Sequence, residues 1–300
     1  ALLQIIRSRC VLAAASIGAW HLGTAEAALT GMLLGQIAGG AAALFTARNM
    51  LGVAQHTPAL RDLATNARYG LAASVASVLH MSASLAVRFL IVRALGVSSA
   101  GAAGFSIAFD LLQRPFSVLV AALHMAAYPE VVASYERGSA QESRIATARL
   151  IELYLCPTIV LLASLVAVLP HIAFLLVPPA LLEGFLASAA AICAFAFANV
   201  HLQMTAAIVP HLLMRTPRLI IVATGQLLAV SGLVAIVLKA GGSAAMALVL
   251  ASLATLLWML TMAGPTWRFG ARPRLWLLLA SAVGSLGVIA LDGLPFQGQG

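Results

Sequence analysis

Three charged side chains interrupt long apolar stretches and are the first candidates for chemistry: Arg88, Asp110 and Arg114. A charge at the centre of a bilayer costs at least about 2.5–3.5 kcal/mol on insertion scales, so such residues usually face a bundle interior or a water-filled cavity. Asp110 precedes Arg114 by four residues, which on a helix places both on one face in the better order for an ion pair. Two interpretations stay open: a self-neutralising structural pair, or part of a site for a charged ligand.

Further polar side chains extend this candidate site. His80 and Arg88 are eight residues apart and therefore lie on broadly the same helix face. Arg88 has no acidic residue at helical spacing, so it is expected either to snorkel to the outer interface or to meet an anion in a cavity. Pro115 predicts a kink beside Arg114, because proline removes an intrahelical hydrogen bond.

Other polar residues within apolar stretches are more often interhelical hydrogen-bond partners than ligands. These residues are Gln36, Gln113, His124, His171, Asn199, His201, Gln203 and Gln226. Of this set Gln113 joins His80, Arg88, Asp110 and Arg114 as a candidate substrate-binding residue. Glu152 is expected to pair with Arg149, and Glu183 to lie at the membrane interface.

The motifs of the common enzyme classes are absent from the sequence. It contains no phosphate-binding glycine loop, no HExxH and no GxSxG. The three cysteines have neither CxxC nor Cys/His spacing and are interpreted as small hydrophobic residues: Cys10, Cys156 and Cys193. No catalytic residue, metal site or cofactor is predicted.

Composition identifies the environment in which these side chains must be held. Hydrophobic residues make up 62% of the 300 residues, charged residues only 9%, and the mean hydropathy is +1.02. A soluble domain has roughly 45–50% apolar and 25% charged residues, so a water-soluble fold is excluded. The net charge of +8 is spread among apolar stretches and not gathered on one face, which argues against nucleic acid as a partner.

Apolar stretches of about 20 residues recur along the chain, as transmembrane helices require. We predict an all-α, polytopic transmembrane bundle of about nine spans, at 3–21, 27–47, 70–95, 101–128, 150–169, 181–204, 218–238, 243–263 and 275–292. Two polar segments, 48–68 and 129–149, are expected to be its substantial loops. Small residues pervade the spans, as in GQIAGGAAA (35–43), and favour close helix packing.

The basic residues predict the orientation of the bundle. If the spans alternate in direction, thirteen of the seventeen Lys and Arg residues fall on one side: Arg7, Arg9, Arg48, Arg61, Arg68, Arg137, Arg144, Arg149, Arg215, Arg218, Arg268, Arg272 and Arg274. Only Arg93 and Lys239 fall on the other side. By the positive-inside rule the first side is cytoplasmic.

Two segments resemble a known family. The segment GAAGFSIAFDLLQRPFSVLVAALHMAAYPEVVASYERGS (101–139) resembles a recurring stretch of the multidrug/oligosaccharidyl-lipid/polysaccharide exporter superfamily, most closely its Wzx-like polysaccharide flippase branch. The carrying features are the polar group from Asp110 to Pro115, then Tyr128-Pro129 leading into ERGS (136–139). WHLGTAEAALTGMLLGQIAGG (20–40) is similar to the last hairpin of the family's first six-helix half.

This resemblance implies helices 5–13 of a MATE/MurJ-like fold. Residues 1–48 would be the last hairpin of the N-terminal half, 49–69 a cytoplasmic linker, 70–264 the C-terminal six-helix half, and 265–300 an extra transmembrane helix. About four N-terminal helices of the family would be missing, and without them this chain alone is not expected to transport, because the family's cavity lies between two halves.

The resemblance also implies a function. The protein would flip an undecaprenyl-pyrophosphate-linked oligosaccharide across the bacterial inner membrane by alternating access, in contact with membrane lipids and with polysaccharide polymerase or assembly proteins as partners. The alternatives are a multidrug (MATE-type) antiporter, which would favour acidic cavity residues, and a membrane-embedded envelope-polysaccharide enzyme. Such an enzyme typically needs a large extracytoplasmic loop, and the outer loops predicted for this chain are short.

Overall fold

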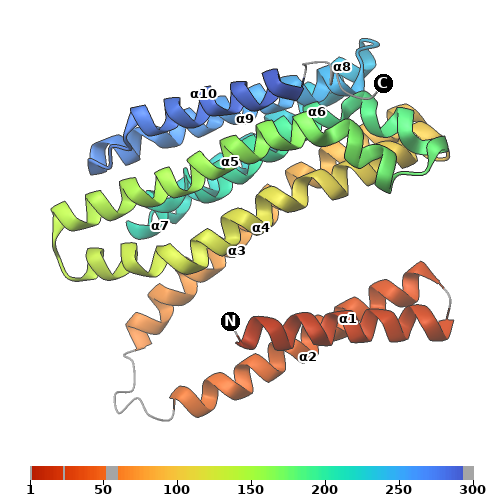
Figure 1. The fold of residues 1–300 in the computed structure, drawn as a ribbon. Coiled ribbons are helices and arrows are strands. Elements are labelled where there is room, and N and C mark those ends of the chain that lie inside the picture. Colours follow the sequence, from red (N-terminus) through yellow and green to blue (C-terminus); the bar gives the residue numbers. More distant parts are fainter. Residues whose placement is uncertain (1, 23, 52–59, 293–300) are drawn as a thin grey trace. The chain divides into compact units, whose positions relative to one another are not determined.

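The structure is a computed structural model that describes residues 2–22, 24–51 and 60–292, and within these ranges it contains helices and no strand (Figure 1). The helices are α1 (Leu2–Leu22), α2 (Ala25–Leu51), α3 (Leu60–Leu95), α4 (Ala100–Glu136), α5 (Ala140–Leu176), α6 (Pro179–Met204), α7 (Ile208–Leu212), α8 (Thr216–Lys239), α9 (Ala244–Phe269) and α10 (Leu275–Asp292). The predicted all-α class is confirmed for this part of the chain.

Six helical segments among the described residues are long and apolar enough to cross a membrane. They lie in α3, α4, α5, α6 continued by α7, α8 and α9, with mean hydropathy between 1.5 and 2.6. The chain is thus a multi-pass helical membrane protein. The remaining three predicted spans coincide with α1, α2 and α10, but the total of nine spans and the MATE/MurJ-like arrangement stay predictions.

The two segments predicted as loops are largely helical. Helix α3 begins at Leu60, while α4 continues to Glu136 and α5 begins at Ala140, which leaves only a tight turn at 137–139. Gly138 takes the left-handed conformation there (φ 75°), and the Ser139 side chain caps α5 by accepting a hydrogen bond from the Glu142 backbone N–H. Residues 52–59 of the other segment lie outside the described residues.

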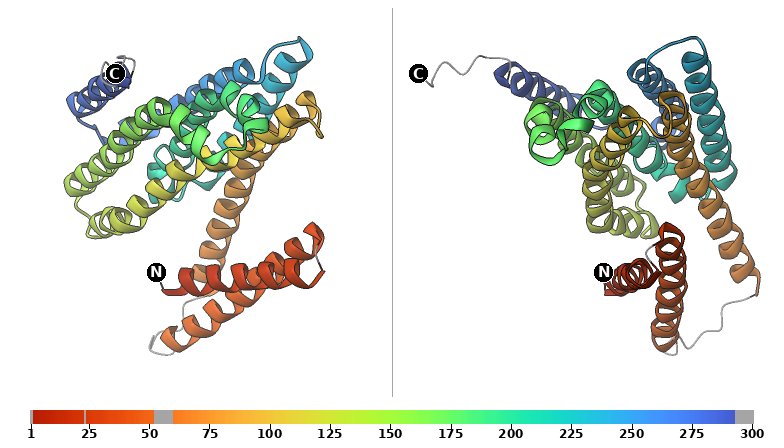
Figure 2. Two further views of the ribbon diagram at one scale, coloured as in Figure 1. Left: turned by 45° about the vertical axis from the view of Figure 1, so that its right-hand side comes forward. Right: turned by 90° about the vertical axis from the view of Figure 1, so that its right-hand side faces the viewer.

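Helix length explains why polar residues occur on these helices. With 37 residues each, α4 and α5 are about 55 Å long at 1.5 Å per residue, whereas the hydrocarbon core is about 30 Å thick. Figures 1 and 2 show the two helices side by side as one long hairpin. The polar residues of 129–149 therefore belong to a helical extension beyond the apolar region.

The chain divides into two compact units, with the boundary between Thr65 and Asn66. In the first unit, α1 and α2 form an antiparallel hairpin. Gly31 and Gly35, four residues apart on α2, lie so close to the α1 backbone at Val11 and Ala14 that a Cβ on either glycine would clash. This small-xxx-small spacing is the usual means of close helix association in lipid.

In the second unit, α4, α5, α6 and α9 form the core. Helix α4 packs along α6, α6 also contacts α5 and α9, and α8 packs on α9. A Cβ on Gly104 of α4 would clash with the α6 backbone at Leu181, and one on Gly184 of α6 would clash with the α4 backbone at Gly101. The largest fully buried side chains in the helix interfaces are those of Phe105, Phe116, Tyr154, Phe185 and Phe195.

Helix α10 is attached to α5 by an ion pair that differs from the prediction. Glu152, 6% exposed, does not pair with the neighbouring Arg149 but accepts hydrogen bonds from the Arg274 guanidinium (Nη2–Oε2, 2.8 Å) and the Arg274 backbone N–H (2.6 Å). Arg274 directly precedes α10, so the carboxylate binds the N-terminal end of that helix, where negative charge is favoured. These hydrogen bonds raise the pKa of the Arg274 guanidinium above its ordinary value.

The ends of the second unit differ in charge. At one end, the α4–α5 turn lies beside the end of α9, because Gly138 and Phe269 line a common pocket with Arg144 and Arg268. At the other end, the α3–α4 turn, the start of α6 and the α8–α9 turn meet around a pocket that has Glu183 as its only charged lining residue among those described. The charge asymmetry predicted along the sequence is therefore also an asymmetry between the two ends of this unit.

Candidate functional site

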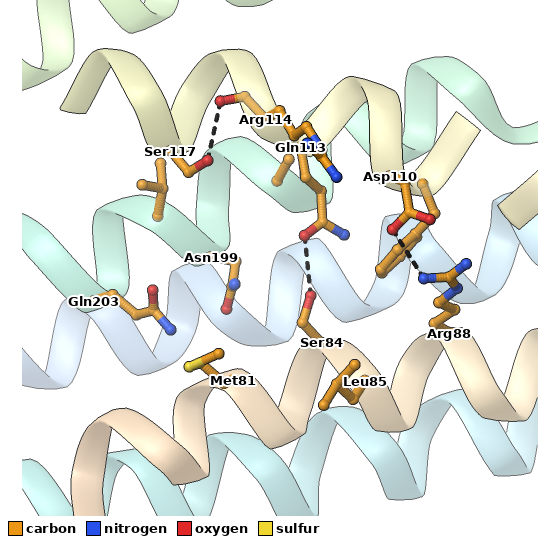
Figure 3. Close-up of a pocket in the computed structure, with 13 residues that line it drawn as sticks. Met81, Ser84, Leu85, Arg88, Asp110, Gln113, Arg114, Ser117, Asn199 and Gln203 are labelled. Atoms are coloured by element: carbon orange, nitrogen blue, oxygen red, sulfur yellow. Dashed lines mark hydrogen bonds and ion pairs between the residues drawn. The ribbon is translucent and has the colours of Figure 1, made fainter. Parts of the chain in front are cut away.

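A polar cavity of about 360 Å³ lies between α3, α4 and α6 (Figure 3). Each helix contributes residues with the spacing i, i+3, i+4, i+7, which is one face of an α-helix. The stripes are Met81, Ser84, Leu85 and Arg88 on α3; Asp110, Gln113, Arg114 and Ser117 on α4; and Ala196, Asn199, Val200 and Gln203 on α6, with Phe109 beside them. All four α4 residues in the stripe are polar.

The cavity residues of α4 lie in the first half of that helix. Asp110 is ten residues and Ser117 seventeen residues from the start of α4, which places them about 15 Å and about 26 Å along the helix axis. They therefore belong to the part of α4 that precedes its polar extension at 129–136, on a helix long and apolar enough to cross a membrane.

Arg88 and Asp110 form the ion pair of this cavity. Arg88 Nη1 of α3 donates a hydrogen bond to Asp110 Oδ1 of α4 at 2.8 Å (Figure 3), and the side chains are 32% and 54% exposed. This pair corrects two predictions. Asp110 pairs with Arg88 and not with Arg114, and Arg88, expected to have no acidic partner, has one. The helical spacing rule finds partners on the same helix, whereas this acid and base are on adjacent helices.

Arg114 lines the cavity without an ion pair among the described residues. The cavity thus holds two guanidinium groups and one carboxylate, a formal net charge of one positive. Pro115 follows Arg114 but does not end the helix: α4 continues through it to Glu136. A guanidinium that is not neutralised by a carboxylate can take up an anionic group.

Gln113 links α4 to α3 and retains a free donor. Its Oε1 accepts a hydrogen bond from the Ser84 hydroxyl at 3.2 Å (Figure 3), while its buried Nε2 has no partner in the described structure. A buried amide N–H without an acceptor costs roughly 1–3 kcal/mol. An acceptor oxygen on a ligand in the cavity would remove that cost.

His80 lies behind the cavity wall instead of lining it. Its Nδ1 is 2.6 Å from Gln226 Oε1, and Gln226 Nε2 donates to Asn199 Oδ1 at 2.9 Å. Gln226 is fully buried, and Asn199 lines the cavity. This buried chain from α3 through α8 to α6 makes His80 a positioning residue for Asn199, not a direct contact.

Both polar side chains and buried apolar residues connect α3 to this unit, since Val87 and Ile91 are fully buried in its main hydrophobic core. Along its described length, the α3 backbone closely approaches the neighbouring helices at few points, whereas α4 and α6 pack along each other. The Arg88, Ser84 and His80 side chains extend to partners on α4 and α8.

Four of the five candidate residues predicted from the sequence line this cavity: Arg88, Asp110, Gln113 and Arg114. The prediction missed other lining residues. Ser84 and Ser117 were not singled out, although each lies on the face of a predicted residue, four before Arg88 and four after Gln113. Asn199 and Gln203 were expected only to form interhelical hydrogen bonds. The available signal was the uninterrupted polar stripe in DLLQRPFS (110–117).

Comparison with known proteins adds no assignment: no protein-family model, curated protein or solved structure matches the chain. Within the described residues, no group of three or more His, Cys, Asp or Glu side chains is arranged to hold a metal ion. The cavity's own chemistry is therefore the basis for a functional proposal.

Proposed function

We propose that this protein is a transporter of the polysaccharide-flippase type, in which the cavity between α3, α4 and α6 receives an anionic group of a lipid-linked oligosaccharide. The observation that carries the proposal is the polar cavity with a net positive charge between the apolar helices α3, α4 and α6. The substrate class follows from the resemblance of segment 101–139 to the Wzx-like branch. A pyrophosphate link supplies the charge and acceptor oxygens that guanidinium and amide groups bind.

In this proposal each residue of the cavity has a separate role. Arg114 attracts the phosphate group, and Gln113 Nε2 donates a hydrogen bond to one of its oxygens. As the anion enters, the Arg88 guanidinium releases the Asp110 carboxylate and binds the phosphate group. Asp110 then holds Arg88 in place when the cavity is empty. Alternating access would require the helices that line the cavity to move relative to one another, with the polar contacts of α3 to α4 and α8 exchanging partners.

The membrane and the direction of transport are part of the same proposal. The Arg-rich end, with the α4–α5 turn, faces the cytoplasm of a bacterial inner membrane, and the substrate moves from the inner to the outer leaflet. Lipids surround the bundle, and polysaccharide polymerase or assembly proteins receive the flipped product.

A transport assay tests the role of Arg88. The protein is expressed from its whole reading frame in a bacterium that lacks its own flippase, and surface polysaccharide is measured at matched membrane expression. Arg88→Ala should abolish complementation, and Arg88→Lys should restore part of it, because a point charge replaces a planar fork. Arg93→Ala is the matched control, since Arg93 lies on the same helix, is exposed and does not line the cavity. Full activity of Arg88→Ala would contradict the proposal.

A multidrug antiporter is the second candidate, favoured by one observation. Asp110 is more than half exposed to the cavity and could bind a cationic compound. In that case Asp110→Asn should abolish the export of a cationic dye such as ethidium, whereas Arg114→Gln should leave export intact or increase it. The flippase proposal expects the opposite ranking for lipid-linked oligosaccharide, with Arg114→Gln the more damaging change.

A further inference from the structure

A second pocket, of about 400 Å³, lies at the Arg-rich end of the bundle and is independent of the cavity described above. It is formed by the α4–α5 turn, the first turn of α5 and the end of α9. Its lining is Tyr135, Gly138, Ser139, Ala140, Ser143, Arg144, Arg268 and Phe269. Among the described residues no other charged residue lines it, so the pocket carries two positive charges.

Neither guanidinium is neutralised within the described part of the chain. Arg144 and Arg268 form no ion pair, and the nearby acids Glu130 and Glu142 both face Arg137, at 3.2 Å and 3.8 Å. The Arg144 side chain passes close over Gly270, which ends α9 with φ 89°: a Cβ there would be 3.0 Å from the Arg144 Cδ. The pocket therefore has two guanidinium groups without an ion-pair partner among the described residues.

Ser143 is the observation that points to a ligand. Its side chain lines the pocket and is 1% exposed, yet its Oγ has no hydrogen-bond partner in the described structure. Ser143 also lies in the first turn of α5, where the helix dipole favours negative charge, while the Glu142 and Ser143 backbone N–H groups already donate to the capping residue Ser139. A buried hydroxyl without a partner costs free energy that an incoming acceptor oxygen would recover.

Aromatic rings border this pocket. Tyr135 and Phe269 lie with ring centroids 6.4 Å apart, and the neighbouring Trp267 is 73% exposed. Such rings are typical of the head-group region. We propose that Arg144, Arg268, Ser143 and the first turn of α5 bind a phosphate group, and specifically the head-group phosphate of an anionic phospholipid at this end of the protein.

Lipid binding by the purified protein tests this site. In detergent, native mass spectrometry follows titration with phosphatidylglycerol and, separately, with phosphatidylcholine. The double variant Arg144→Gln/Arg268→Gln should bind phosphatidylglycerol at least roughly tenfold more weakly, since hydrogen bonds to charged groups contribute about one to two factors of ten. The control is Arg215→Gln/Arg272→Gln, which loses the same charge at positions outside the pocket. Equal loss in both double variants would overturn the site.

Ser143→Ala separates binding from folding. Removing an unpartnered buried hydroxyl should leave thermal stability of the lipid-free protein equal or higher, while phosphatidylglycerol binding falls several-fold. A drop in stability together with unchanged binding would overturn the assignment of Ser143. Competition with inorganic phosphate distinguishes a lipid from a soluble ligand. If phosphate displaces the lipid only at far higher concentrations, the site is a lipid site. If inorganic phosphate binds tightly and this binding is lost in Arg144→Gln/Arg268→Gln, the ligand is a soluble phosphate compound and not a lipid.

Discussion

Arg88 and Asp110, on adjacent helices and 22 residues apart, are joined by a hydrogen-bonded ion pair of 2.8 Å inside an apolar bundle. The pair connects α3 to α4 across a cavity, where the α3 backbone itself makes few close approaches. Its coupling can be measured without knowledge of the substrate.

A double-mutant cycle should detect that coupling. Arg88→Gln and Asp110→Asn together are expected to destabilise the protein less than the sum of the single changes, with a coupling free energy of about 0.5–1 kcal/mol, because both side chains are partly exposed. Unfolding in detergent provides the measurement. The cycle of Asp110→Asn with Arg114→Gln is the control and should give a smaller value; a larger one would restore the local pair expected from the helical spacing.

The Glu152–Arg274 pair should control the attachment of α10. In Glu152→Gln the acceptor of the Arg274 contacts loses its charge, so the melting temperature should fall by a few degrees and amide exchange in α10 should become faster. Arg272→Gln serves as the control, because Arg272 is exposed and lies in the same connection. Unchanged exchange in α10 would show that other contacts with α5 hold it.

The crossing of α4 and α6 depends on two glycines. Gly184→Leu should cost about 1–3 kcal/mol, since its side chain would collide with the backbone at Gly101 and separate the helices. Gly232→Leu on α8 is the matched control, because a Cβ at Gly232 meets nothing within 4 Å. Equal melting temperatures for the two variants would contradict this packing.

Orientation in the membrane can be tested at the two ends of the second unit. In a background without Cys10, Cys156 and Cys193, cysteine replaces Gln141 at the start of α5 or Val97 in the α3–α4 turn; both positions are exposed. We expect an impermeant thiol reagent added to intact spheroplasts to label Val97→Cys and not Gln141→Cys, by the positive-inside rule. The reverse pattern would invert the topology.

The helical nature of the fold and much of the site were predictable because they depend on local information. Apolar length identified the spans, and the polar stripe at Asp110, Gln113 and Arg114 indicated one face of one helix. The partners were not predictable, because Arg88–Asp110 and Glu152–Arg274 join residues on different helices, and the sequence alone does not specify which helix faces which. The extension of α4 and α5 through 129–149 was missed because polarity was interpreted as a loop, although Ser139 and Gly138 are ordinary helix-end residues.

The distance in sequence between Glu152 and Arg274 has a consequence for biosynthesis. Arg274 is added 122 residues after Glu152, which at about 5–20 residues per second takes roughly 6 to 24 seconds. Throughout that interval the final partner of the Glu152 carboxylate does not yet exist. Arg149, three residues earlier on the same helix, is the cation then within reach. We therefore expect the nascent chain to use the local pair and the finished protein to exchange it for Arg274 as α10 arrives.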